Sequence, residues 1–210
     1  MKFSSIILLV SLLLLESGCI GIRNNKLPQV DKKDLQFFSA KKTKLFSSWN
    51  FDSQELPTES KSQSNQVQVS DAFKKRFNNF ITNSGCCIMV SKPSAADVIL
   101  EGEMYNDNNK NTVLTAALIS PLTLYIIPSW IEAKHHMVIK AKSGNKFASY
   151  ELQDSLTIVQ WLPLIVALPF RDSPAKTANQ MFDNAMNTLL LRIKNDGFIS
   201  NTKSHSKHGK

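Results

Sequence analysis

The chain has 210 residues and a formal net charge of +8, with 25 lysine and arginine residues against 17 aspartate and glutamate residues. This length is consistent with one domain once the terminal segments are set aside. The sequence contains no phosphate-binding loop, nucleophile elbow or cluster of metal-ligand residues. We expect the excess positive charge to favour anionic lipid or cell-wall polymer over nucleic acid.

The first segment, residues 1–18, has the pattern of a secretory signal peptide. Lys2 gives the positive start, and residues 6–15 form an apolar run that is too short to span a bilayer. The following Ser-Gly-Cys at 17–19 resembles the bacterial lipobox, in which small residues precede a cysteine that becomes lipidated. In that class the next residue directs sorting, and Ile20 in place of aspartate implies the outer membrane. The alternative is an ordinary signal peptide followed by an unrelated cysteine.

Residues 19–66 are interpreted as a basic, polar tether. They are rich in lysine, serine, glutamine and asparagine, and residues 59–65 have the composition of a flexible linker. Aromatic side chains between Phe37 and Phe51 show that the segment is not wholly polar. Residues 45–51 are therefore expected to form either a strand or a docking peptide.

A helix is expected to begin at Ser70, which has a capping hydroxyl, and to stop at Gly85. The alternation at residues 66–69, just before it, predicts a short strand. The apolar residues of the helix recur at helical spacing and are expected to pack in the core rather than hold a cofactor: Phe73, Phe77, Phe80 and Ile81.

Residues 86–90 and 97–105 are expected to form two further strands. Adjacent residues of a strand point to opposite faces, so Cys86 and Cys87 are not expected to form an ordinary disulfide. No other ligands lie nearby for a metal site, and packing is the expected role of both thiols.

A β-hairpin is predicted over residues 132–154. Gly144 and Asn145 supply a two-residue turn, which sets Ser143 opposite Lys146. Pairing outward from that turn places one face of the hairpin in the core, and a shift of one residue would mix apolar and charged side chains. The apolar face is formed by Met137, Ile139, Ala141, Ala148, Tyr150 and Leu152.

His135 and Asp154 face each other at the open end of this predicted hairpin. Two interpretations are open: a proton-handling pair, or a hydrogen-bonded pair where the strands fray. The second is favoured, because no third catalytic partner is evident. We therefore predict no catalytic residue.

Two uncharged apolar runs flank the hairpin, at residues 112–131 and 155–170. Because strand ends in a hairpin are neighbours, both runs emerge at the edge opposite the turn. Each contains two prolines, which count against a straight helix, so we favour non-spanning segments over the alternative of two membrane spans. Docking on lipid or on a membrane complex is predicted for 122–130 and 161–170. The candidate docking residues are Leu124, Tyr125, Pro128, Trp130, Trp161, Pro163, Pro169 and Phe170.

The last helix is expected to begin at Ser173-Pro174 and to end at Gly197. Ser173 is the expected cap, and one face of the helix carries a stripe of apolar residues. Residues 200–210 are interpreted as a disordered basic tail.

The segments around the hairpin resemble those of a group of small, poorly characterised proteobacterial lipoproteins. A Leu-x-x-x-Pro-x-Trp segment precedes the hairpin, and a segment that starts with tryptophan and ends in Pro-Phe follows it. The matching residues are Leu124, Pro128 and Trp130, then Trp161, Pro169 and Phe170. The resemblance covers roughly residues 70–199 and implies no activity. The order helix, sheet, helix is also similar to that of lipoproteins that serve as accessory subunits of envelope assembly or secretion machines.

These patterns together predict a two-layer α+β domain over residues 67–199. It has four to five mostly antiparallel strands with two helices packed on one face. The predicted protein is a non-enzymatic, lipid-anchored envelope lipoprotein on the periplasmic face of the outer membrane. Its expected partners are membrane lipid, through an acylated Cys19, and a membrane-protein complex of which it is a subunit. We expect no cofactor, metal, nucleic acid or small-molecule substrate, and an envelope enzyme of unknown reaction has the least support.

Overall fold

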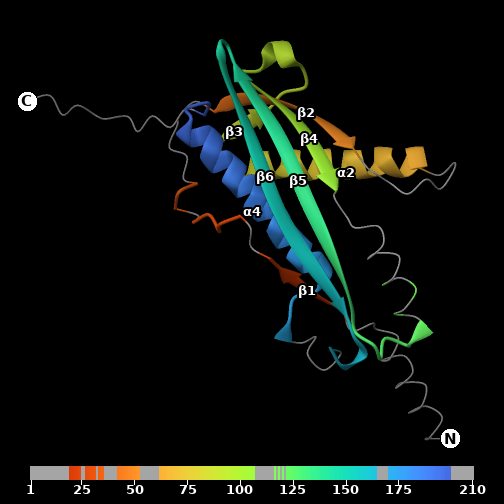
Figure 1. The fold of residues 1–210 in the computed structure, drawn as a ribbon. Helices are drawn as coiled ribbons and strands as arrows, with labels where there is room; N and C mark the ends of the chain where they lie inside the picture. The colour runs from red at the N-terminus through yellow and green to blue at the C-terminus, as the bar shows by residue number, and fades with distance from the viewer. Residues whose placement is uncertain are drawn as a thin grey trace, which may run out of the picture. The chain divides into compact units, whose positions relative to one another are not determined.

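The computed structural model describes residues 19–24, 27–31, 33–35, 42–52, 62–106, 116, 118, 120, 122–164 and 170–199. The predicted signal peptide and tail, and Pro169, lie outside these ranges. Figure 1 shows the elements in chain order: β1 (Cys19–Arg23), β2 (Thr43–Asp52), α2 (Ser62–Asn83), β3 (Cys87–Met89), the short 3-10 helix η1 (Pro93–Ala95), β4 (Val98–Asn106), β5 (Ser129–Ser143), β6 (Lys146–Gln160) and α4 (Pro174–Asn195).

The described strands form one six-stranded sheet in the order β1-β6-β5-β4-β2-β3. β4 and β5 are antiparallel, as are β1 and β6, whereas β2 runs parallel to both β3 and β4. The α+β class is thus confirmed. The predicted sheet of four to five mostly antiparallel strands is corrected to a mixed sheet of six. Parallel pairing is possible for β2 because α2 provides the crossover that a parallel connection needs.

The predicted hairpin is confirmed and is longer than expected. β5 ends at Ser143 and β6 begins at Lys146, so Gly144 and Asn145 form the two-residue turn. The strands continue to Ser129 and Gln160, well into both apolar runs. The predicted apolar face is buried except for Ala148, which is half-buried, and Lys140 and Lys142 on the other face are exposed.

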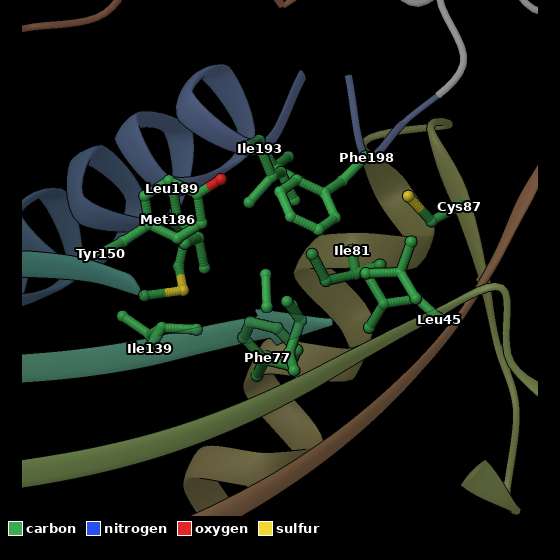
Figure 2. Packing of buried hydrophobic residues seen from close by; sticks show 14 of the residues in the cluster. Leu45, Phe77, Ile81, Cys87, Ile139, Tyr150, Met186, Leu189, Ile193 and Phe198 are labelled. Carbon is green, nitrogen blue, oxygen red and sulfur yellow. The ribbon is translucent and has the colours of Figure 1, made fainter. Parts of the chain in front are cut away.

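The core lies where both helices cover one face of the sheet, and Figure 2 shows part of it. Leu45, Leu100 and Ile139 come from three different strands and are fully buried. Phe77 and Ile81 of α2 pack against this face together with Leu189 of α4 and its buried neighbours. The prediction that the aromatic stripe of the first helix is core is confirmed. In β4, Gly102 lies directly beneath the indole ring of Trp49.

The first helix begins earlier than predicted. Residues 66–69 are helical, so the predicted short strand is wrong, and Ser70 lies inside α2. Four alternating residues are too few to separate a strand from a helix, and Val69 lies one helical repeat before Phe73. The predicted stop is correct, because Gly85 follows the end of α2 with a φ of +73°.

Cys86 and Cys87 form a disulfide between adjacent residues, which corrects the expectation of two separate thiols. That expectation assumed that both residues belong to the strand, but β3 begins at Cys87 and Cys86 lies in the preceding bend. Their side chains are therefore not forced to opposite faces. Both cysteines are buried.

The chain divides into two compact units. Unit 1 comprises the described residues of Met1–Asn24, Asn108–Lys134 and Ser155–Met181, and unit 2 comprises those of Asn25–Asp107, His135–Asp154 and Phe182–Lys210. The core described above belongs to unit 2. Two strands lie within the predicted tether at 19–66: β1 in unit 1 and β2 in unit 2. These parts of the segment are sheet, because alternate residues of β2 such as Leu45 and Trp49 are buried.

Candidate functional site

Every predicted site residue that the structure describes belongs to unit 1. The first of them, Cys19, has a partly buried thiol that belongs to no disulfide, and it opens strand β1. β1 pairs antiparallel with the end of β6, so that Cys19 lies opposite Gln160 and Arg23 opposite Leu156. The amide of Asn24 continues the pairing by donating to the carbonyl of Ser155 at 3.0 Å. Cys19 is therefore part of the sheet.

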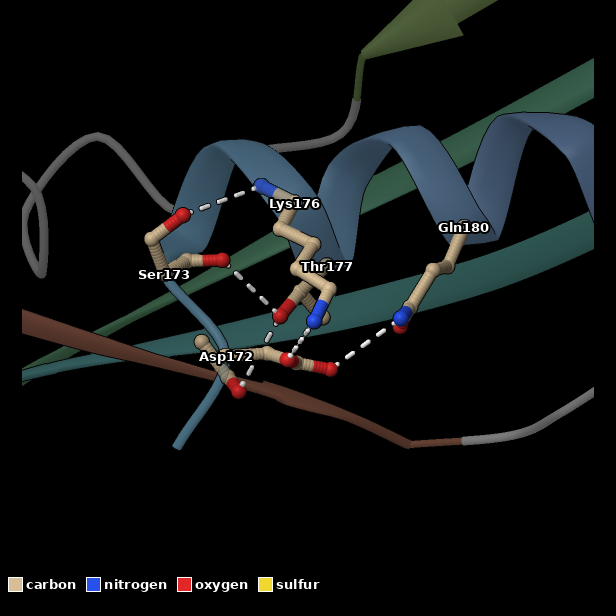
Figure 3. A network of polar contacts seen from close by, with 6 residues as sticks. Asp172, Ser173, Lys176, Thr177 and Gln180 are labelled. Carbon is tan, nitrogen blue, oxygen red and sulfur yellow. Dashed lines mark hydrogen bonds and ion pairs between the residues drawn. The ribbon is translucent and has the colours of Figure 1, made fainter. Parts of the chain in front are cut away.

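The other edge of β1 is covered by the start of α4, as Figure 3 shows. The amide of Gly21 donates to the carbonyl of Asp172 at 3.2 Å. The hydroxyl of Thr177 lies 3.2 Å from the carbonyl oxygen of Gly21 and 3.1 Å from that of Ser173. These contacts leave no space for a side chain at residue 21, where a Cβ would lie 2.6 Å from the Thr177 hydroxyl oxygen. β1 is thus held on both sides.

The first turn of α4 is itself anchored by polar contacts. The predicted cap is present, since the Ser173 hydroxyl accepts a hydrogen bond from the amide of Lys176 at 3.3 Å. The carboxylate of Asp172 pairs with the Lys176 ammonium at 2.6 Å and accepts from the Gln180 amide at 3.0 Å. These contacts lower the pKa of the Asp172 carboxyl. Asp172, whose carbonyl receives the β1 amide, is fixed in place by this network.

The two predicted docking segments meet at the end of the β5–β6 hairpin opposite its turn. The amide of Leu162 donates to the carbonyl of Tyr125 at 2.7 Å, and the indole N–H of Trp161 donates to the carbonyl of Ile126 at 2.9 Å. In the same loop region, the hydroxyls of Ser120 and Ser129 share a 2.5 Å hydrogen bond. Both serines are buried in unit 1, and no sequence pattern pointed to them.

The loop that carries Leu124 is strained. Leu124 and Tyr125 have φ values of +50° and +58°, in the left-handed region that residues with a Cβ rarely occupy. Each such residue costs about 1–2 kcal/mol relative to the right-handed conformation. Tyr125 is held by its amide, which donates to the carbonyl of Ser120 at 2.7 Å, and by its carbonyl, which accepts from Leu162. The loop thus keeps a costly conformation that directs Leu124 outward, where its side chain is 71% exposed.

Large apolar side chains are exposed around these segments. Eleven are exposed among the described residues, and all except Ile88 and Phe147 belong to unit 1. We call the following group the apolar end: Leu122, Leu124, Ile126, Ile127, Trp130 and Trp161. Trp130 is 62% exposed and Trp161 is 38% exposed. Exposed apolar groups that gather in one place are typical of an interaction surface.

The remaining predicted docking residues differ in how exposed they are. Pro128 and Pro163 are exposed, and Tyr125 is only half-buried. Phe170 is 84% exposed and comes two residues before Asp172, whose carbonyl accepts from the Gly21 amide of β1. No described helix is long and apolar enough to cross a bilayer. Residues 129–131 and 155–160, at the hairpin ends of the two apolar runs, are strand.

The His135 and Asp154 pair lies elsewhere, in unit 2. The predicted fraying is wrong, because both strands continue past this pair to Ser129 and Gln160. Asp154 is only 4% exposed. Burial lowers the pKa of His135, and the negative charge of Asp154 partly opposes that shift. Among the described residues, no group of three His, Cys, Asp or Glu side chains is placed to hold a metal ion.

Comparison of the sequence with models of known protein families and with curated proteins found no match. The resemblance to proteobacterial lipoproteins therefore stays a prediction.

Proposed function

We propose that this chain is a lipid-anchored envelope lipoprotein, acylated at Cys19 and held at the periplasmic face of the outer membrane. Its role is non-enzymatic, as an accessory or structural subunit of an envelope assembly or secretion complex. The Ser-Gly-Cys at 17–19 and the apolar run before it support lipidation, and Ile20 supports the choice of membrane. Each methylene buried in lipid contributes about 0.8 kcal/mol, so two or more acyl chains make a stable anchor.

One observation carries this proposal. Cys19 lies opposite Gln160, and the next residue along β6 is Trp161 of the apolar end. A lipid attached at Cys19 would thus begin beside the apolar end. The docking segments 122–130 and 161–170 supply the contact through which the protein works.

The test is membrane fractionation of the full chain beside its Cys19→Ser variant, with an alkaline carbonate wash. We expect the wild type to stay in the membrane and the variant to be released, because the wash removes proteins that lack a stable anchor. A variant that stays after the wash would show that the apolar segments hold the protein in lipid on their own, and it would favour insertion of residues 112–131 and 155–170 as spans. Mass spectrometry of the wild-type N-terminal peptide reports acylation directly.

A second variant tests the docking role. Replacing Trp130 and Trp161 with aspartate should abolish co-purification of a membrane-complex partner while circular dichroism and the unfolding midpoint stay close to those of the wild type. Unchanged co-purification would refute docking through these segments. Phe147→Asp, which alters an exposed aromatic residue of unit 2, is the matched control.

A further inference from the structure

We infer that the apolar end is embedded in the same lipid leaflet that holds the acyl chains of Cys19, so that unit 1 lies directly on the bilayer without a tether. This inference rests on the proposed lipidation. It adds which surface of unit 1 faces the membrane, what that surface contacts, and how unit 1 is oriented on the bilayer. The occupant is the acyl region of a membrane leaflet. A protein partner and a second copy of the chain are the competing occupants.

The position of the anchor carries the first step. A flexible tether of n residues spans roughly 5–6 Å × √n, which lets a tethered domain move away from the membrane. Cys19 is the first residue of β1 and is already paired with β6. On its other edge β1 is held by Asp172 and Thr177 through Gly21. No slack remains between the lipidated residue and the fold, so unit 1 has to rest against the bilayer.

The register of β1 decides which surface meets the lipid. Gln160, the partner of Cys19, is followed by Trp161, and the Trp161 indole is bonded to Ile126. Ser129, at the start of β5, lies next to the same Gln160, with 3.4 Å between the Ser129 hydroxyl and the side-chain oxygen of Gln160. Trp130 follows directly. Both apolar segments therefore leave the sheet at the strand end where the acyl chains begin.

Backbone hydrogen bonding favours lipid as the occupant. Inside a bilayer, polar backbone groups have no water and have to be satisfied within the protein. The N–H groups of Tyr125 and Ile126 donate to Ser120 and Thr123, and their carbonyls accept from Leu162 and the Trp161 indole. Two further positions, Pro128 and Pro163, have no N–H to satisfy.

The distribution of charge agrees with a lipid-facing surface. Residues 112–131 and 155–170 contain no charged side chain. The nearest charges in the sequence are Lys110 and Glu132 around the first run and Asp154 and Arg171 around the second. Trp130 and Trp161 are of the residue type that gathers where acyl chains meet head groups. A surface for a soluble protein partner would carry a polar rim among its apolar residues. The loop between Leu122 and Trp130 offers only the hydroxyls of Thr123 and Tyr125, because Ser129 is buried.

Fluorescence quenching tests the inference on the acylated full chain. The protein is purified from membranes in detergent and reconstituted into vesicles of phosphatidylethanolamine and phosphatidylglycerol, with or without bromine atoms on the acyl chains. The chain has three tryptophans, and Trp49 is buried in the core of unit 2. We expect brominated vesicles to remove the emission of Trp130 and Trp161. The matched control replaces both with phenylalanine, keeps Trp49, and should lose no emission.

The outcomes separate the inference from the proposed function. Mass spectrometry of the same sample shows whether Cys19 is acylated, and an unmodified protein that does not enter vesicles refutes the proposed anchor. An acylated protein with equal emission in brominated and ordinary vesicles keeps the anchor and overturns the lipid-embedded surface. Crosslinked dimers or a co-purified protein with unquenched tryptophans would assign the surface to a second copy or to a partner instead.

Discussion

Replacing Gly21 with alanine tests how firmly β1 is held in unit 1. A Cβ at this position would lie 2.6 Å from the Thr177 hydroxyl oxygen and 2.9 Å from the Cα of Pro174. The second contact is with backbone, which cannot rotate away. Forcing an extra methyl group into a packed site costs about 1–3 kcal/mol. Because Gly21 also bonds to the Asp172 carbonyl, we expect this cost to appear as opening of β1.

Amide hydrogen exchange measures that opening. Each 1.4 kcal/mol is a factor of ten in an equilibrium constant, so the amides of β1 that pair with β6 should lose protection by about 5- to 150-fold. Amides of the unit 2 core should change little. Ile22→Ala is the matched control, because it alters the neighbouring residue of the same strand, whose side chain is already half exposed. Unchanged protection in the Gly21→Ala variant would refute the packing of α4 against β1.

Two further predictions concern unit 2. Gly102→Ala should lower the free energy of unfolding by about 1–3 kcal/mol, because the new Cβ would collide with the Trp49 ring. Urea denaturation measures this loss. A loss no larger than that of a substitution at an exposed position would contradict the packing of Gly102 against Trp49. The pKa of His135 is lowered on folding, so the unfolded chain binds the proton more readily, and stability should fall as the pH drops through about 6.5. His135→Gln should flatten the pH dependence of the urea midpoint, and His136→Gln is the control. An unchanged pH dependence in the His135→Gln variant would assign the titration to another group.

The hairpin was predictable in detail because its determinants are local. Gly144 and Asn145 fix the turn, and the turn fixes every pair along β5 and β6. The alternation of buried residues then selects the same register independently. The end of α2 near Gly85 and the cap of α4 at Ser173 follow from equally local chemistry. These parts of the fold needed no knowledge of the rest of the chain.

The parts that sequence analysis missed depend on distant partners. β1 has only five residues, and two isoleucines on either side of Gly21 are too short a pattern to mark a strand. It becomes a strand because its backbone groups pair with β6 and with Asp172. β2 was predicted only as one of two alternatives for residues 45–51, because it lies in a stretch rich in lysine and serine whose composition favoured a tether. The Cys86–Cys87 bond depended on where β3 begins, and strand boundaries are poorly defined by sequence.

In the candidate site, too, some features were predictable from local sequence and others depended on distant parts of the chain. The exposed residues Leu124, Trp130 and Trp161 were identified from the uncharged runs around the hairpin. The strain at Leu124 and Tyr125 was not, because leucine and tyrosine give no signal of a left-handed backbone. The place of Cys19 in the sheet was also missed, since it follows from pairing with a strand far along the chain.

The position of β2 in the sheet bears on how unit 2 folds. Its two neighbours, β3 and β4, are both made after it, and both pair with it in parallel. Pairing β5 with β6 closes a loop of two residues, whereas pairing β2 with β4 closes the loop of residues 53–97. Each doubling of loop length adds about 0.6 kcal/mol of entropic cost, so the β2–β4 pairing is the more costly of the two to form. A newly made chain therefore carries β2, with Phe46, Trp49 and Phe51, unpaired on both edges until β3 is made, and unpaired on one edge until β4 is complete. Such an unpaired apolar strand is a binding site for chaperones and a starting point for aggregation, and it makes this strand the vulnerable step in producing the protein.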